Sequence, residues 1–333
     1  MNLANEKRAL LRQNQIRFFL LWFCLSLNAC SSLPDIDQLS KLNKRPPLPT
    51  PTPLMLPYNN MVATAEAGLK PLAQAKAHYE RGNVYFSLGN YEAALADYNQ
   101  ALTFEPASAR TYNNRALTYA TMDKIDEALA DYAMAVRLNP AYLQAYKNRL
   151  TLLEERNDLS GMIADYGQLA NLDSANRATY LYKQGNTYLR LDDWVNSRRA
   201  FEDALAINPK HPDALYQRAF MNLGDKRVVE ALNDLDKVLE LTPRAANAYY
   251  LRGLAYNASN DPSRALADFS QALALRPNYP EALIGRASVS AATKNLAQAQ
   301  ADLAQLQNLQ PPPDEAFNPV IKALRQQISS KNP

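Results

Sequence analysis

The stretch Ala246–Tyr279 reads ANAYYLRGLAYNASNDPSRALADFSQALALRPNY, and its pattern decides the fold. Its small residues recur at wide intervals: Gly253, Ala265 and Ala272. Phe269 is the large apolar residue between the last two, and the turn-forming pair Asn260-Asp261 lies near the middle. Pro277 follows the second apolar segment, and proline does not continue a helix. The stretch therefore predicts two helices joined by a short turn.

This pattern returns along the chain with a period of 34 residues. The closing prolines lie 34, 69, 34, 34 and 34 residues apart: Pro106, Pro140, Pro209, Pro243, Pro277 and Pro311. The interval of 69 is two periods plus one residue. The repeats cover residues 75–311 and divide into seven units: 75–108, 109–142, 143–177, 178–211, 212–245, 246–279 and 280–313. Recurrence at one fixed period predicts a repeat architecture.

Aligned, the seven units agree in several columns. One column is mostly small: Gly82, Ala116, Leu150, Gly185, Ala219, Gly253 and Ala287. Another is large: Tyr98, Tyr132, Tyr166, Phe201, Leu235, Phe269 and Leu303. Small residues in both helices, a large residue between them and a closing proline resemble the tetratricopeptide repeat (TPR). The resemblance implies an all-α fold, a right-handed α-solenoid of seven helical hairpins in which each hairpin buries its apolar face against its neighbours.

The third unit, residues 143–177, departs from the pattern. Leu150 and Met162 stand where small residues belong, Ser174 replaces the closing proline, and one residue is extra. One expectation is looser packing with a local change of curvature between the third and fourth units. Simple repacking of side chains is the other.

Two charged columns lie sixteen residues apart. Six units share an arginine and an aspartate: Arg81 and Asp97, Arg115 and Asp131, Arg149 and Asp165, Arg218 and Asp234, Arg252 and Asp268, Arg286 and Asp302. The fourth unit has Gln184 and Ala200 instead. Because both partners are missing together, we expect an ion pair between the two helices of each of the other hairpins, with N···O distances below about 4 Å.

The two ends of the chain have different roles. Residues 314–330 are predicted to form a capping helix, because Val320, Ile321, Leu324 and Ile328 share one face. Residues 1–29 combine four basic residues with a ten-residue apolar run, too short for the roughly 20 residues of a membrane span. Such a segment suits a secretory signal.

Leu27-Asn28-Ala29-Cys30 resembles a bacterial lipobox, although Asn28 departs from its usual small residue. The resemblance implies that Cys30 becomes a lipidated N-terminus and, because Ser31 follows, that the protein is held at the outer membrane, facing the periplasm. An uncleaved apolar anchor helix is the alternative. Residues 30–70 are predicted to be a tether, since their prolines favour an extended polyproline II spacer.

The TPR resemblance also implies a concave groove lined by the first helix of each unit. Positions on one face of these helices are the candidates for peptide binding: Lys76, Tyr79, Asn83, Arg110, Asn113, Lys147, Tyr182, Asn186, Tyr216 and Tyr250. Tyrosine supplies contact area, and asparagine both donates to and accepts from a peptide backbone. For each single residue, packing within a hairpin is the alternative. Basic candidates occur early in the chain, so acidic groups of a peptide are expected toward the first unit.

One TPR ligand is not expected. Asn83 and Asn114 match the carboxylate clamp of chaperone-binding TPRs, but Tyr79, Gln144 and Asn148 stand where the clamp needs basic groups.

Catalysis finds no support in the sequence. His78 and His211 lie on different units, and no HExxH, GxSxG or phosphate-binding glycine loop occurs. The only cysteines, Cys24 and Cys30, exclude a cysteine-based metal site in the repeats, and no cofactor is predicted. Without residues 1–29 the charges nearly balance, which argues against nucleic acid as a partner.

We therefore expect a non-enzymatic scaffold or adaptor that binds peptide segments of periplasmic or envelope proteins. A pilotin-like assembly factor for a pilus or secretion secretin is the alternative, and self-association is a third reading.

Overall fold

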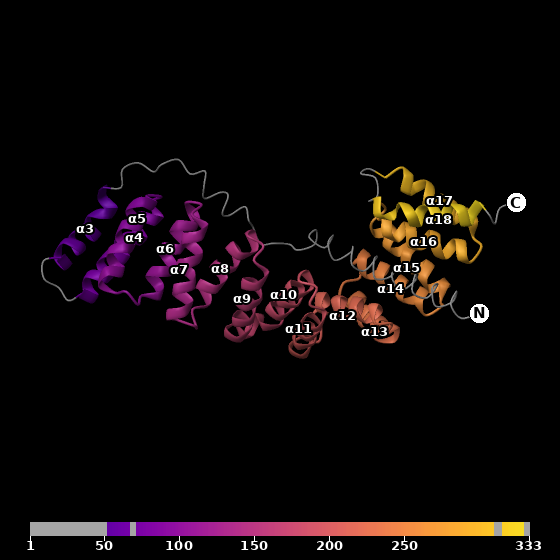
Figure 1. The fold of residues 1–333 in the computed structure, drawn as a ribbon, viewed down its shortest axis with the longest axis horizontal. Helices are drawn as coiled ribbons and strands as arrows, with labels where there is room; N and C mark the ends of the chain where they lie inside the picture. The colour runs from indigo at the N-terminus through magenta and orange to yellow at the C-terminus, as the bar shows by residue number, and fades with distance from the viewer. Residues whose placement is uncertain (1–51, 67–70, 310–314, 330–333) are drawn as a thin grey trace. The chain divides into compact units, whose positions relative to one another are not determined.

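The structure is a computed structural model that describes residues 52–66, 71–309 and 315–329, and these residues form helices with no strand among them. The α-helices are α3 (Thr52–Glu66), α4 (Pro71–Ser87), α5 (Tyr91–Phe104), α6 (Ala109–Thr121), α7 (Ile125–Leu138), α8 (Leu143–Glu155), α9 (Leu159–Leu172), α10 (Arg177–Arg190), α11 (Trp194–Ile207), α12 (Pro212–Gly224), α13 (Val228–Leu241), α14 (Ala246–Ala258), α15 (Pro262–Leu275), α16 (Pro280–Ala292), α17 (Leu296–Gln307) and α18 (Asn318–Ser329) (Figure 1). Short 3-10 helices at Ser174–Asn176 and Glu315–Phe317 precede α10 and α18.

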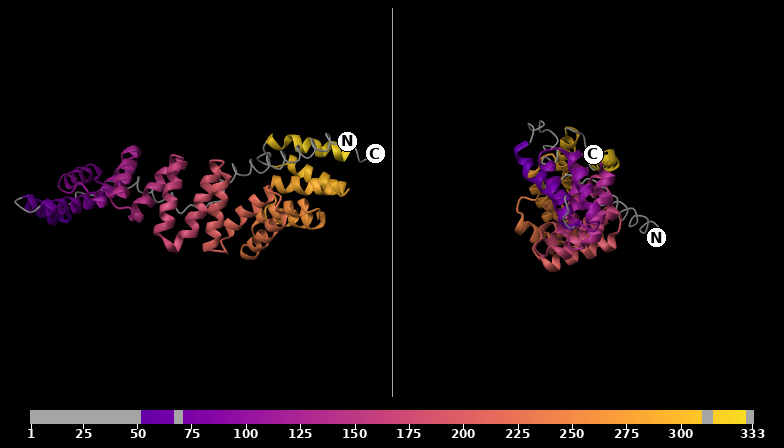
Figure 2. Two further views of the ribbon diagram at one scale, coloured as in Figure 1. Left: turned by 60° about the horizontal axis from the view of Figure 1, so that its bottom comes forward. Right: turned by 90° about the vertical axis from the view of Figure 1, so that its left-hand side faces the viewer.

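These helices belong to two compact units, one ending at Asp192 and the other beginning at Asp193. The first unit contains α3, the hairpins α4–α5, α6–α7 and α8–α9, and then α10. The second contains α11, the hairpins α12–α13, α14–α15 and α16–α17, and then α18. Within each unit, each helix packs against the next in chain order (Figures 1 and 2). The predicted fold class of consecutive helical hairpins is confirmed.

Each hairpin turn contains one residue in the left-handed region. These residues and their φ angles are Gly89 (75°), Asp123 (60°), Asn157 (56°), Asp192 (56°), Lys226 (63°), Asn260 (62°) and Lys294 (67°). In five turns an Asn or Asp side chain then caps the second helix by accepting a backbone N–H: Asn90, Asp158, Asp193, Asp261 and Asn295. In two turns the left-handed residue is a lysine, Lys226 or Lys294.

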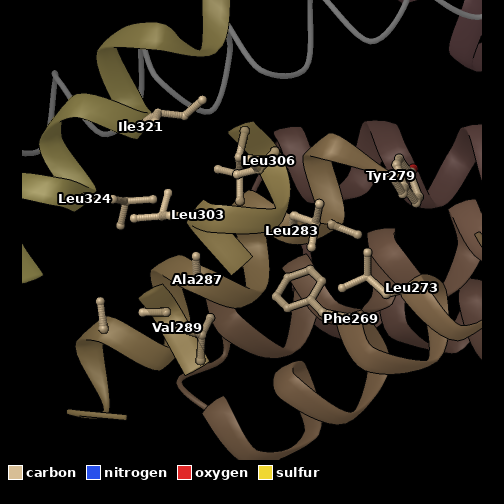
Figure 3. Close-up of a cluster of buried hydrophobic side chains, with 14 of the residues drawn as sticks. Phe269, Leu273, Tyr279, Leu283, Ala287, Val289, Leu303, Leu306, Ile321 and Leu324 are labelled. Carbon is tan, nitrogen blue, oxygen red and sulfur yellow. The ribbon is translucent and has the colours of Figure 1, made fainter. Parts of the chain in front are cut away.

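The small columns let large side chains lie against helix backbones. A Cβ added at Gly253 would stand 2.8 Å from Phe269 Cε1, and one added at Gly285 would stand 2.9 Å from the same atom. Phe269 is fully buried between these two glycines, in the cluster drawn in Figure 3. Gly82 makes the same close approach to Tyr98 in the first hairpin. Small residues on the first helices therefore set how closely the hairpins pack.

The third hairpin, α8–α9, is packed differently from its neighbours. Its large residues Leu150 and Met162 are both buried, and α9 contacts α10 more extensively than it contacts α8. Bulky side chains at positions that are small elsewhere hold two helix axes apart. The burial of Leu150 and Met162 agrees with the expected repacking of side chains, and a 3-10 helix at Ser174–Asn176 stands where the other units have their closing proline.

The tether prediction is wrong for residues 52–66, which form α3. Met55 and Val62 are buried, and α3 packs against α4 in the way that a second helix packs on the following first helix elsewhere. The apolar pattern of this segment overrides its prolines, and Pro57 is exposed within the helix. The predicted signal segment, Cys30 and the rest of the predicted tether lie outside the described residues.

The predicted capping helix is confirmed as α18. Its residues Ile321, Leu324 and Ile328 are buried, and it packs against α16 and α17 (Figure 3). Phe317, just before it, is buried in the same cluster. Among the described residues, no helix combines the length and apolarity needed to cross a bilayer.

Candidate functional site

Asparagine side chains connect the first helices α4 and α6 in the first unit. Asn114 Nδ2 donates hydrogen bonds to Asn83 Oδ1 at 2.8 Å and to the Tyr79 hydroxyl at 3.1 Å. The Tyr98 hydroxyl, from α5, also donates to Asn83 Oδ1, at 2.8 Å. Two of the predicted candidates, Tyr79 and Asn83, are therefore brought together by Asn114, which fixes their positions.

The same chain of amides continues from α6 to α8. Asn113 Nδ2 donates to Asn114 Oδ1 at 3.0 Å, and Asn148 Nδ2 donates to Asn113 Oδ1 at 3.2 Å. Gln144 Nε2 then donates to Asn148 Oδ1 at 2.6 Å. Asn113 is buried, so its role is to hold α6 and α8 in register, and the packing alternative is the better description of this residue.

Exposed cations flank this amide chain. The Arg110 guanidinium is exposed and lies 5.9 Å from the centre of the Tyr79 ring. Burial raises the pKa of Tyr142, nearby Tyr79 adds to the rise, and Arg110 opposes it. Lys76 has 73% of its side chain exposed and lies 3.7 Å from Glu80. The side chains of Arg110 and Lys76 therefore carry positive charge at the surface where an acidic peptide group was expected.

Lys147 is held by an internal partner that the sequence did not indicate. Its Nζ lies 3.2 Å from Asp173 Oδ2, and Tyr180 donates to the same oxygen at 3.3 Å. Burial lowers the pKa of Lys147, but hydrogen bonds with Asp173 and Tyr180 outweigh this and raise it. A hydrogen bond from Asn176 and the contact with Lys147 lower the pKa of Asp173. Asp173 reaches α8 because the third unit has a 3-10 turn where other units have a proline.

Tyr182 and Asn186 lie one turn apart on α10 and are both half-buried. Asn186 Oδ1 is buried and accepts no hydrogen bond within the described part of the chain.

The candidates of the second unit, Tyr216 and Tyr250, are buried, with 6% and 5% of their surface exposed. The Tyr250 ring lies 6.0 Å from Phe269 and 5.2 Å from Tyr279, centre to centre. Burial raises the pKa of Tyr250 well above its usual range. This tyrosine packs hairpins together, which again matches the packing alternative.

The arginine–aspartate pairs are confirmed in all six hairpins that carry both residues. Five of the shortest N···O distances are 2.6 to 2.7 Å: Arg81–Asp97, Arg115–Asp131, Arg218–Asp234, Arg252–Asp268 and Arg286–Asp302. Arg149 and Asp165 pair in the same way. In every case Nε and Nη2 both donate to the carboxylate, so the pairs are bidentate.

A second contact of these arginines was missed from the sequence. In three hairpins Nη1 also donates to the preceding hairpin's second helix: Arg115 to Asn99 (2.6 Å), Arg252 to Asp236 (2.7 Å) and Arg286 to Ser270 (3.2 Å). These acceptors also lie sixteen residues away, on the N-terminal side. The spacing of sixteen residues is present in the sequence, but the acceptors are an asparagine, an aspartate and a serine. Because they differ in chemical type, they do not form a recognisable column in the aligned units.

The histidines have structural partners. His78 Nδ1 lies 2.9 Å from Asp97 Oδ1, beside the Arg81 pair. His211 caps α12, where Nδ1 accepts the Ala214 N–H at 3.3 Å, and burial lowers its pKa. Among the residues that the structure describes, no three His, Cys, Asp or Glu side chains gather as a metal site would require.

Comparison with known families identifies the repeat. A model described as TPR repeat matches residues 82–123, and tetratricopeptide repeat models match residues 109–142, 178–211 and 246–279. Three of these ranges have the same bounds as predicted units. The chain therefore contains tetratricopeptide repeats, and its hairpins are those of a TPR solenoid.

Several solved structures are similar to this chain. The C-terminal part of a TPR repeat-containing protein from Cytophaga hutchinsonii is 19% identical, with a TM-score of 0.54, and the match covers 72% of this chain and 98% of that one. YrrB, described as a TPR protein with an unusual peptide-binding site, is 20% identical with a TM-score of 0.47, and the match covers 56% of this chain and 95% of YrrB. Pseudomonas aeruginosa pilF is 20% identical with a TM-score of 0.43, covering 62% and 94%. No match is found among curated proteins.

Proposed function

We propose that this protein is a non-enzymatic scaffold that binds an extended or helical peptide segment of a partner protein along the first helices α4, α6 and α8. The partner is a periplasmic or envelope protein, and a lipid on Cys30 holds the scaffold at the outer membrane. One observation carries the binding proposal: exposed Arg110 lies over Tyr79, next to the Asn83–Asn114 amide pair.

The groups on this surface are suited to a peptide with acidic side chains. Arg110 and Lys76 offer exposed positive charge, and Tyr79 offers a ring against which a ligand can pack. Within the described residues Asn83 uses its carbonyl oxygen for Tyr98 and Asn114, which leaves its amide group to donate to a peptide carbonyl. Because the amide chain already fixes these side chains, little conformational freedom is lost when a peptide binds.

A capture experiment tests the binding surface. The full chain is used to capture partners from detergent-solubilised envelopes. The affinity of each captured protein is then measured for the natural chain and for an Arg110→Ala/Lys76→Ala variant. We expect a loss of about tenfold or more in affinity, since two charged contacts of about 1 kcal/mol each are removed. Arg137→Ala is the matched control, because Arg137 is exposed but lies on α7, which is the second helix of its hairpin. The affinity of the Arg137→Ala variant for the captured protein should be unchanged.

The identity of the captured protein separates the two functional readings. Cell-wall hydrolases or other envelope machinery would support the adaptor, whereas a secretin would favour the pilotin-like alternative. Equal loss in the Arg137 control, or no loss in the double variant, would reject the proposed surface. Light scattering on the purified chain tests self-association, which α3 and α18 oppose by covering the terminal hairpins of their units.

Anchoring is tested separately with Cys30→Ala. We expect loss of radiolabelled fatty acid and release of the protein from the outer-membrane fraction, because stable attachment needs more than one acyl chain. A Cys30→Ala protein that stays in the membrane would instead support the uncleaved apolar anchor.

A further inference from the structure

The second unit contains a cavity of about 320 Å³ that is lined by α11, α12 and α13. Its apolar lining includes Leu205 of α11 and Leu215 of α12, which are both buried, together with Ala206 and Pro209. Cavities that bind small molecules have volumes of about 300–1,000 Å³. This cavity therefore has room for one small ligand, and none of its residues belongs to the proposed peptide surface on α4, α6 and α8.

Three charged side chains also line the cavity, and each comes from a different helix. They are Glu202 of α11, Arg218 of α12 and Lys237 of α13. Glu202 and Lys237 are exposed, and within the described part of the chain no ion pair joins any two of the three. Arg218 is balanced by its bidentate partner Asp234. One positive group, Lys237, and one negative group, Glu202, are therefore left without an opposite charge beside them.

Arg218 also has a donor that points to a ligand. Its Nε and Nη2 donate to Asp234, and in three other hairpins the remaining nitrogen, Nη1, donates to the residue sixteen positions earlier. For Arg218 that residue is Glu202, which is close enough to contribute to the raised pKa of Arg218. Among the described residues, however, Glu202 accepts no hydrogen bond from Arg218, and both side chains line the cavity. Nη1 is therefore available to an acceptor that enters the cavity.

We propose that this cavity binds the zwitterion of a free amino acid that has an apolar side chain. The α-carboxylate accepts hydrogen bonds from Arg218 Nη1 and Lys237, the α-ammonium group donates to Glu202, and the side chain packs against Leu205 and Leu215. A zwitterion provides an opposite charge for both Lys237 and Glu202, and its bonds to them are charge-assisted. Asp234 already holds the Arg218 guanidinium in place, so little of its freedom is lost on binding.

The sixth hairpin shows what removes such a site. Arg252 forms the same bidentate pair with Asp268, but its Nη1 donates to Asp236 at 2.7 Å. The position of Lys237 is occupied there by Gln271, 34 residues later. Neither the available donor nor the second cation is present, so we assign the amino-acid site to the fifth hairpin and use the sixth as its control.

Isothermal titration calorimetry of the full chain tests the ligand class, with leucine, N-acetyl-leucine and leucinamide as the three probes. We expect leucine to bind with a Kd of about 1 mM or tighter, because two charged groups and an apolar side chain are held together. N-acetyl-leucine lacks the ammonium group and leucinamide lacks the carboxylate, so each should bind at least about tenfold more weakly. Equal affinity for the three probes, or no binding of leucine at about 10 mM, would overturn the proposal.

Variants of the lining test the location of the site. Lys237→Ala and Glu202→Gln change exposed side chains outside the Arg218–Asp234 pair, and each should weaken leucine binding by about tenfold. Their controls are Lys322→Ala on α18 and Asp236→Asn at the matching position of the sixth hairpin, which should bind leucine normally.

Filling the cavity gives a second, independent test. Ala206→Phe should abolish leucine binding, whereas Ala274→Phe, an exposed position two repeats later on α15, should not. Circular dichroism of each variant checks that it is folded. Leucine binding that survives both Lys237→Ala and Ala206→Phe would place the ligand elsewhere and overturn the proposal, while loss of peptide capture alone would leave it standing.

Discussion

Replacing Asp268 by alanine tests how much one buried ion pair stabilises a hairpin. Arg252 Nε and Nη2 donate to the two Asp268 oxygens at 2.7 and 2.9 Å, and only 8% of the Asp268 side chain is exposed. The hydrogen bond with Asp268 is the largest cause of the raised pKa of Arg252. The substitution leaves the guanidinium without the carboxylate that it binds in bidentate fashion.

The cost follows from how much water reaches Arg252. Removing one partner of a fully buried pair costs about 3–5 kcal/mol, because the other charge is left uncompensated. The Arg252 side chain is 21% exposed and keeps its bond to Asp236 at 2.7 Å, so water and Asp236 offset part of this cost. We therefore expect Asp268→Ala to destabilise the sixth hairpin by about 2–3 kcal/mol.

Asp236→Ala is the matched control because it removes the other carboxylate from the same arginine. Asp236 is 50% exposed, and an exposed ion pair contributes about 0–1 kcal/mol. The assay is native-state hydrogen exchange of the α14 and α15 amides, which reports the free energy of local opening without assuming two-state unfolding. Equal costs for the two substitutions would refute the reasoning that burial and bidentate geometry make the first pair the stronger one.

Three other substitutions test separate features of the fold. Gly253→Ala should lower the free energy of unfolding, measured by urea denaturation, by about 1–2 kcal/mol. The added methyl group would clash with Phe269, and this cost exceeds the gain in helix propensity. A variant more stable than the natural protein would show that Phe269 moves aside freely. Burial lowers the pKa of His211, so the stability from this cap is present above the unfolded pKa of about 6.5 and is lost as the pH falls toward the folded pKa. Between pH 7 and pH 5 the natural protein should lose up to about 1 kcal/mol more stability than His211→Asn loses, since asparagine caps without titrating; an equal loss in both would contradict this. Leu324→Asp should detach α18 and expose the face that includes Ile321, and light scattering should then show self-association; a monomer with unchanged protection in α17 would argue against a capping role.

The repeat could be predicted from the sequence because its determinants are local and recur. Gly253 and Phe269 belong to columns with a 34-residue period, and each closing proline marks the end of a second helix. The arginine–aspartate pairs were predictable for the same reason, since their joint absence from the fourth unit identified the partners. Segment α3 was not, because its prolines favour an extended chain and its helix depends on burying Met55 and Val62 against α4.

The candidate site was predicted less completely. The sequence placed Tyr79, Asn83 and Arg110 on one face, which the periodicity of a helix is sufficient to do. It could not separate Arg110, which is exposed, from Asn113 and Tyr250, which are buried and pack the hairpins together.

The sequence by itself therefore determined the number of hairpins, their turns and the ion pair inside six of them, because all of these depend on spacing along the chain. Only the tertiary structure decided which side chains stay available to a partner. Asp173 reaches Lys147, and Asn114 reaches Asn83, across distances in sequence that no period encodes. Such contacts depend on how closely one helix approaches the next, and that approach is set by the packing of residues from several units at once.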